Sequence, residues 1–143
     1  MSGLAPLLDV TATESQKAYE QFFQCIDSRS MAPPALQPTT KIVWNGSPLG
    51  GRDAFMAMLA QMPTTKHEVT GFNVHPFPNG DTNALNMMMD TSGRVQFGSE
   101  RGANIFAFQA TFVLRRAGAG APLVTEQLVY RLVYKPADAT ISI

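Results

Sequence analysis

The second half of the chain alternates apolar and polar side chains with a period of two, and this pattern constrains the fold more than any other feature of the sequence. The alternation runs through four successive segments, at 66–77, 83–90, 103–116 and 124–135. Pro78, Asn79 and Gly80 predict a turn after the first segment, and Ser92-Gly93 predicts a further turn or bulge before Val95 and Phe97. Four long strands in succession favour a meander.

Two helices are expected ahead of these strands. Thr11 and Glu14 fit a capping box that would start the first helix, and apolar side chains then recur at three- and four-residue spacing to near Ser28. These apolar positions are Ala18, Tyr19, Phe22, Phe23 and Ile26. A second helix is expected to follow Gly50-Gly51 and to end at Pro63.

A proline-containing stretch and a short strand separate the two helices. Residues 31–40 contain three prolines and indicate a linker or a distorted short helix. Lys41–Trp44 is expected to be a strand that ends in a tight turn at Asn45-Gly46. Helices that precede strands predict an α+β domain, in which a curved antiparallel sheet packs on the N-terminal helices and forms a cone.

Length and charge indicate a single soluble domain. We expect the 143 residues to form one domain over residues 11–143, with a flexible tail at residues 1–10. Eleven basic residues balance eleven acidic ones, which argues against strong non-specific attraction to nucleic acid or to a membrane. No signal-peptide pattern and no membrane-spanning apolar run are present, so an intracellular protein is expected. Cys25 is interpreted as a small apolar side chain in the first helix.

The sequence contains no recognisable catalytic motif, and no metal or cofactor is expected. His67 and His75 are predicted to share one face of a strand, roughly 26 Å apart, which is too far for one metal ion. A cone-shaped domain can hold a small-molecule site, as in ketosteroid isomerases and small dehydratases. The candidate residues for such a site are Tyr19, Asp53, His75 and Asp90. Each has a simpler structural explanation, and the Phe and Met side chains of the inward rows are expected to fill the cavity.

The last two predicted strands are apolar on both faces, although a strand with one wet face should alternate cleanly. One row, which includes Phe106, Phe108, Phe112, Leu128 and Tyr130, can cover the domain's own helices. The opposite row mixes apolar and polar side chains, as protein interfaces do. The predicted partner-binding residues are Gln109, Thr111, Val113, Gln127, Val129, Arg131 and Val133. The alternative is that these strands lie between two layers of the same chain.

Arg131 stands alone as a charged residue inside this row of the last strand, and Lys135 follows only at the strand's predicted end. A buried guanidinium needs a carboxylate or several carbonyls, and the pattern places few acids of the same chain near it. A carboxylate on a partner is therefore the natural expectation. The alternative is a solvated position at the edge of the sheet.

Four stretches resemble one known family. Residues 42–51, with Trp44-Asn45-Gly46 at their centre, resemble a segment of the nuclear-transport-factor-2-related export proteins that precedes a helix, and Gln61-Met62-Pro63 is similar to the end of that helix. Residues 108–114 and 129–132 resemble its last two strands, the second of which carries an arginine in animal members. The resemblance covers residues 11–135, and the proline-rich stretch and the short loop at Ala117 are similar to the fungal small subunit.

The resemblance implies a cone-like nuclear-transport-factor-2 fold and a non-catalytic small subunit of the messenger-RNA export receptor. It implies a sheet-to-sheet heterodimer with the large subunit, with Arg131 placed like the arginine that pairs with an aspartate of that subunit. Nucleoporin phenylalanine-glycine repeats would be bound through the heterodimer, RNA only indirectly or weakly, and membranes not at all. The expected location is the nucleus and the nuclear pore, with shuttling to the cytoplasm.

Two alternatives stay open at this point. One is a homodimeric import factor for the Ran GTPase in its GDP form, although the acidic residues that hold Ran in that protein have no convincing counterpart here. The other is a small cone-fold isomerase or dehydratase.

Overall fold

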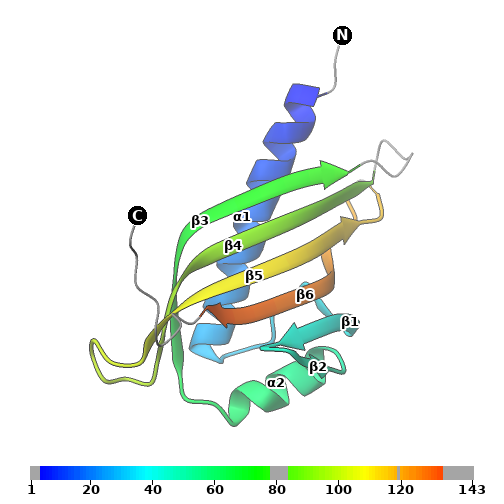
Figure 1. Cartoon of the computed structure of the whole chain (residues 1–143). Coiled ribbons are helices and arrows are strands. Elements are labelled where there is room, and N and C mark those ends of the chain that lie inside the picture. Colours follow the sequence, from blue (N-terminus) through cyan, green and yellow to red (C-terminus); the bar gives the residue numbers. More distant parts are fainter. Residues whose placement is uncertain (1–3, 78–83, 119, 134–143) are drawn as a thin grey trace.

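The computed structural model describes residues 4–77, 84–118 and 120–133 (Figure 1). The elements are α1 (Leu4–Ser28), β1 (Leu36–Trp44), β2 (Ser47–Leu49), α2 (Arg52–Ala60), β3 (Thr65–Phe77), β4 (Leu85–Phe97), β5 (Ile105–Arg116) and β6 (Val124–Val133). The turn predicted at Pro78, Asn79 and Gly80 and the predicted end of the last strand at Lys135 lie outside the described residues.

The six strands form one sheet, and the two helices lie on one side of it. The strand order is β2-β1-β6-β5-β4-β3, so β3 to β6 form the predicted meander. The sheet is mixed and not wholly antiparallel as predicted, because β6 ends the meander in the same direction as β1 and pairs with it in parallel. Figure 1 shows α1 crossing behind the strands, with α2 beside β1 and β2.

The first helix is longer than predicted. It begins at Leu4, and Pro6 is compatible with its first turn because an amide there has no intrahelical partner. Thr11 is buried inside the helix, where its hydroxyl donates to the Leu7 carbonyl at 2.7 Å, so the predicted capping box is wrong. Leu7, Leu8 and Val10 are exposed on this early part of the helix. The boundary between a tail and a domain at residue 11 stays a prediction.

The predicted inward rows form the core. Phe22, Phe23 and Ile26 of α1 pack on the rows of β5 and β6, and Phe112 lies 4.9 Å from the Phe22 ring, centroid to centroid. Met87 and Met89 of β4 are also fully buried. The hollow found between α1 and the sheet has a volume of only about 10 Å³. Cys25 is buried in α1, and this burial raises the pKa of its thiol, as suits a structural residue.

A bulge in β3 changes which side chains point inward. The register shifts between Val69 and Gly71, opposite Gly93 of a continuous β4, so the irregularity predicted at Ser92-Gly93 adds its extra residue to β3. A Cβ on Gly93 would lie 1.9 Å from the Glu68 carbonyl oxygen, so only glycine fits there. Val69 and Phe72 both turn inward as a result, and the prediction that they lie on opposite faces is wrong.

The same bulge separates the two histidines. His67 precedes it and points inward, whereas His75 follows it and is exposed. The prediction that they share one face is therefore wrong, because one inserted residue reverses the parity of a strand.

The first strand begins earlier than predicted, at Leu36 instead of Lys41. A register irregularity between Leu36 and Lys41 accommodates Pro38, which has no amide to donate. Asn45 and Gly46 form the predicted tight turn, with φ of 49° and 84°. Positive φ at both positions is the signature of a two-residue hairpin turn.

Candidate functional site

The candidate site is the outer face of the sheet, by which we mean the side turned away from α1. All seven predicted interface residues lie on it. The strand register sets Val129 beside Thr111, Arg131 beside Gln109 and Val133 beside Ala107. Gln127 lies beside Val113, which in turn lies beside Met88 of β4. Alternation along two strands therefore brings the predicted residues together on one continuous surface.

This outer face exposes an unusual amount of apolar surface. Of the nine large apolar side chains that are exposed in the described residues, five lie on it. They are Phe77 (38%), Val129 (42%), Ile105 (47%), Met88 (48%) and Val133 (48%). Within the described residues, α1 and α2 pack against the sheet from its other side, so neither helix covers these side chains. Exposed apolar side chains gathered on one face of a sheet are typical of an interaction site.

A polar network crosses the middle of this apolar surface. Nε of Arg131 donates to the side-chain oxygen of Gln109 at 3.0 Å, and the Gln109 amide nitrogen donates to both carboxylate oxygens of Asp90 at 3.1 Å. The Thr111 hydroxyl also donates to Asp90, at 3.0 Å. Opposite charges on β6 and β4 are thus connected through β5.

Two predictions are corrected by this network. Asp90 lies in the middle of β4 and not in front of a turn, because β4 continues through Ser92 and Gly93. Arg131 is exposed, and Gln109 connects it to one carboxylate of its own chain, that of Asp90, which the sequence pattern did not place near it. The acid was missed because Asp90 is brought close by strand register, which alternation within a strand does not reveal.

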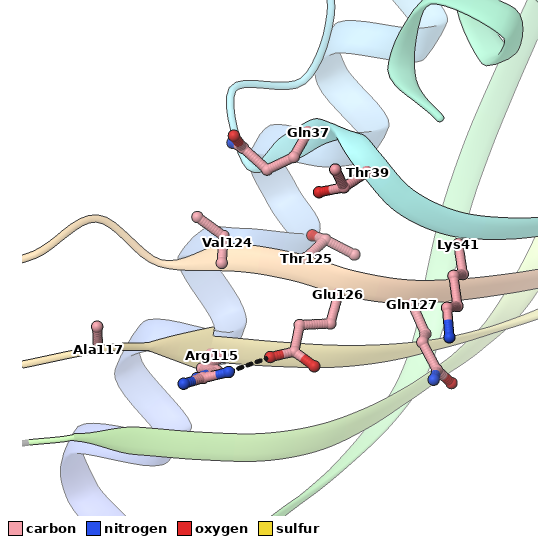
Figure 2. A pocket seen from close by; sticks show the side chains of 9 residues that line it. All are labelled: Gln37, Thr39, Lys41, Arg115, Ala117, Val124, Thr125, Glu126 and Gln127. Carbon is pink, nitrogen blue, oxygen red and sulfur yellow. Dashed lines mark hydrogen bonds and ion pairs between the residues drawn. The ribbon is translucent and has the colours of Figure 1, made fainter. Parts of the chain in front are cut away.

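An open hollow of about 480 Å³ adjoins one end of the outer face (Figure 2). It lies where β1, β6 and β5 meet, and Figure 2 shows Lys41 and Gln127 on one side of it and the Arg115–Glu126 ion pair, 3.0 Å long, on the other. The hollow is polar and open to solvent, and register shifts on both sides of β6 help to form it. Such an open hollow differs from the enclosed, mostly apolar pockets that hold small molecules.

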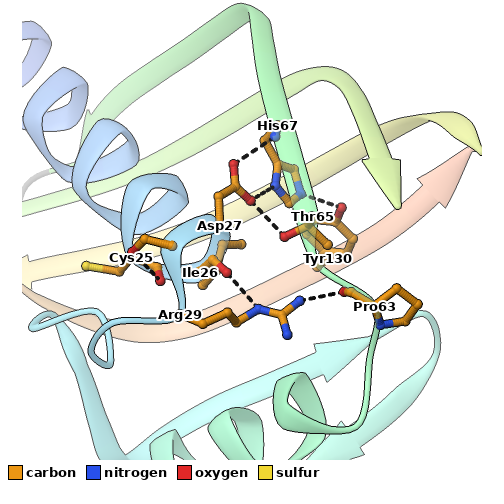
Figure 3. A network of polar contacts seen from close by, with 9 residues as sticks. Cys25, Ile26, Asp27, Arg29, Pro63, Thr65, His67 and Tyr130 are labelled. Carbon is orange, nitrogen blue, oxygen red and sulfur yellow. Dashed lines mark hydrogen bonds and ion pairs between the residues drawn. The ribbon is translucent and has the colours of Figure 1, made fainter. Parts of the chain in front are cut away.

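A second polar network is buried on the inner side of the sheet (Figure 3). Asp27, at the end of α1, accepts from Thr65 at 2.8 Å and from the His67 amide at 2.7 Å, and its Oδ1 lies 2.6 Å from Nδ1 of His67. Nε2 of His67 lies 2.8 Å from the Tyr130 hydroxyl. Because a carboxylate only accepts, Nδ1 donates to Asp27, and in the neutral ring Nε2 accepts from Tyr130.

This buried network connects α1 to β3 and β6 and was missed from the sequence. The one feature of the sequence that could have indicated the network is a histidine at an inward position of β3. His67 could be assigned to the inward side only if the bulge in β3 was recognised. Burial first, and the charge of Asp27 second, raise the pKa of the Tyr130 phenol far above its usual range. The His67 side chain is fully buried. The network therefore stabilises the packing of α1 against β3 and β6. Next to it, Arg29 donates to the Leu59 and Pro63 carbonyls and connects α1 to the end of α2.

The four residues considered for an enzyme site do not converge. Tyr19 packs on Phe72 at 5.0 Å between ring centroids, and Asp53 is exposed in the first turn of α2. His75 and Asp90 are on the outer face. Among the residues that the structure describes, no three potential metal ligands are grouped, and no helix combines the length and apolar character needed to cross a membrane.

The fold and the outer face define a class: a nuclear-transport-factor-2-like α+β domain with an open, partly apolar sheet surface. Residues 4–123 match the family model described as nuclear pore RNA shuttling protein Mtr2, and the chain belongs to this family. The resemblance to export proteins is thereby confirmed. The family associates with the nuclear pore and is a family of shuttling proteins and not of enzymes, so the predicted non-catalytic role is confirmed as well.

Known relatives agree with this assignment. An NTF2-related export protein of Caenorhabditis elegans is 25% identical over 85 residues, which are 57% of this chain and 62% of the relative. The chain therefore spans less than two thirds of that relative's length.

Solved structures show the same fold. Nuclear transport factor 2 of Cryptosporidium parvum superposes with a TM-score of 0.68 at 14% identity, over 86% of this chain and 94% of the other. A chain of the Candida albicans Mtr2–Mex67 M domain complex superposes with a TM-score of 0.64 at 16% identity, over 90% of this chain and 99% of the other. At these identities the likeness establishes the α+β fold alone.

Proposed function

We propose that this chain is the small subunit of a heterodimeric messenger-RNA export receptor, and that its outer sheet face packs against the sheet of a similarly folded domain in a large subunit of the Mex67 type. The observation that carries the proposal is the exposed apolar face with the charged network at its centre. The Candida albicans neighbour, which is a complex with a Mex67 M domain, supports the choice of partner.

The proposal assigns the contacts to named residues. Gln109, Thr111, Val113, Gln127, Val129, Arg131 and Val133 contact the partner's sheet. A carboxylate of the large subunit reaches the Arg131 guanidinium, whose Nη1 is not used in the contact with Gln109. Val129 and Val133 supply apolar contact area, which is the main favourable term in association.

The rest of the function follows from the heterodimer. Nucleoporin phenylalanine-glycine repeats are bound through the pair of subunits, and the pair shuttles between nucleus and cytoplasm. Eleven acidic residues balance eleven basic ones, which favours indirect rather than direct binding of RNA.

Co-expression with the Mex67 M domain encoded by the same genome, followed by sizing and mass determination, tests the proposal. We expect a one-to-one complex. Arg131→Glu should weaken it by about 2–5 kcal/mol, because it places a negative charge against the partner's carboxylate. Lys17→Glu is the matched control, since it makes the same charge reversal on an exposed position of α1, on the other side of the sheet.

Two results would contradict the proposal. A stable homodimer that ignores the M domain would favour the import-factor alternative. A complex whose affinity is unchanged by Arg131→Glu would place the partner on another surface.

A further inference from the structure

The polar network of the outer face orients the side chain of Arg131 through Gln109 and Asp90. Arg131 uses Nε and Nη2 on the oxygen of Gln109, and Asp90 holds the amide nitrogen on the opposite side, so the amide cannot turn over without losing both contacts. An isolated glutamine can turn its amide by 180° at little cost, whereas a carboxylate can accept only from the nitrogen side. Asp90 therefore fixes the orientation of Gln109, and Gln109 fixes the guanidinium.

The same carboxylate has acceptor capacity left over. Oδ1 of Asp90 accepts from Gln109 and from Thr111, whereas Oδ2 accepts from Gln109 among the described residues. Two oxygens offer about four acceptor positions. When a partner sheet covers the outer face and removes water, an ionised carboxylate with an unused acceptor position is costly unless the partner supplies a donor.

We infer that Asp90 is a second charged docking residue of the outer face, which positions Arg131 through Gln109 and which requires a cationic or amide donor on the partner. This inference rests on the proposed heterodimer and specifies its chemistry. The partner's sheet is expected to present a pair of groups: a carboxylate facing Arg131 and a donor facing Asp90. A purely acidic patch on the partner would suit Arg131 and repel Asp90.

Asp90→Asn in the heterodimer tests the inference. Asparagine keeps the shape and one acceptor oxygen, which Thr111 and Gln109 can share, but loses the charge and the second acceptor. Because the network lies on the open face of the sheet, the isolated chain should keep a melting temperature close to that of the parent. Affinity for the M domain, measured by titration calorimetry, should fall about tenfold or more because the partner's donor loses its charged acceptor. The dependence of affinity on salt concentration should also become weaker.

Glu68→Gln is the matched control. It makes the same carboxylate-to-amide change on the same face, in an exposed pair with Arg94 at the β3 side of the sheet. We expect less than about a threefold change in affinity, since exposed ion pairs contribute little.

Gln109→Met separates positioning from direct contact. It is similar in size and removes the hydrogen bonds to Asp90 and to Arg131, so Arg131 loses its orientation while both charges stay. We expect affinity to fall about tenfold, and we expect a further Arg131→Gln change to cost much less in this variant than in the parent.

The outcomes separate this inference from the proposed function. If Asp90→Asn binds as tightly as the parent while Arg131→Glu still weakens the complex, Asp90 has no docking role and the heterodimer stands. If Gln109→Met leaves the cost of Arg131→Gln unchanged, the positioning role is overturned. If the parent itself does not bind the M domain, the proposed function fails and the inference fails with it.

Discussion

Tyr130 is the largest fully buried side chain described, and its polar atom lies deep in the core with Nε2 of His67 as its partner. Its ring also stacks on Trp44 at 3.8 Å between centroids. The raised pKa of the phenol keeps it protonated, so it can donate to His67 across the whole neutral range. Tyr130 therefore stabilises the fold in two ways, by packing its ring in the core and by donating a hydrogen bond to the buried Nε2 of His67.

Removing the hydroxyl gives a prediction that depends on pH. Tyr130→Phe leaves Nε2 of His67 without its donor, which should lower the free energy of unfolding by about 1–3 kcal/mol at pH 7. An unfolded tyrosine ionises near pH 10.0, whereas the folded pKa is higher, so the folded parent retains a proton that the unfolded chain loses. The parent's stability should therefore fall as pH rises above 10, and the phenylalanine variant should lack this contribution. Urea unfolding of both proteins at pH 7, 9 and 11 checks this, and a difference that does not narrow by pH 11 would contradict it.

At the scale of elements, strand alternation predicted the meander and the two faces of β5 and β6, but it did not predict breaks in the alternation. The seven proposed interface residues follow from parity alone, because β5 and β6 are regular over most of their length. His67 and Asp90 were misplaced for two different physical reasons. An inserted residue in β3 reversed the parity around His67, and the neighbours of Asp90 were set by inter-strand register, which a single strand's pattern does not contain.

The bulge itself can be tested by a pair of glycine substitutions. Gly93→Ala would push a methyl group against the Glu68 backbone, which is only 1.9 Å away, and should cost about 2 kcal/mol or more in stability. Gly71→Ala is the control from the same bulge, because its added Cβ meets nothing closer than the Ser92 hydroxyl at 3.7 Å. Chemical denaturation of the two variants and the parent distinguishes them. Equal effects from both substitutions would show that the close approach of Gly93 to β3 does not exist.

At the scale of the whole molecule, the two sides of the sheet have different tasks. The inner side is filled by α1, α2 and the aromatic rows, and Asp27, His67 and Tyr130 pair with one another there. The outer side keeps apolar side chains in water, which lowers the chain's solubility and gains nothing for its own stability. That arrangement is expected for a subunit whose outer sheet face is covered by a partner. The proposed interaction surface therefore lies on the strands and not on the helices.

Partner binding should therefore appear as stability of this chain. A ligand that binds only the folded state at one hundred times its dissociation constant adds about 2.7 kcal/mol to the free energy of unfolding. For a domain of this size, such a gain corresponds to roughly 5–10 °C in melting temperature. Differential scanning calorimetry of the chain, the M domain and their mixture should show the chain's transition moving upward by this amount. Arg131→Glu should remove this shift. The same substitution should leave the melting temperature of the free chain near that of the parent, because Arg131 is exposed in the free chain. A mixture that melts as the sum of its parts, at concentrations where the parent chain elutes as a complex, would mean that the partner does not bind the folded sheet face.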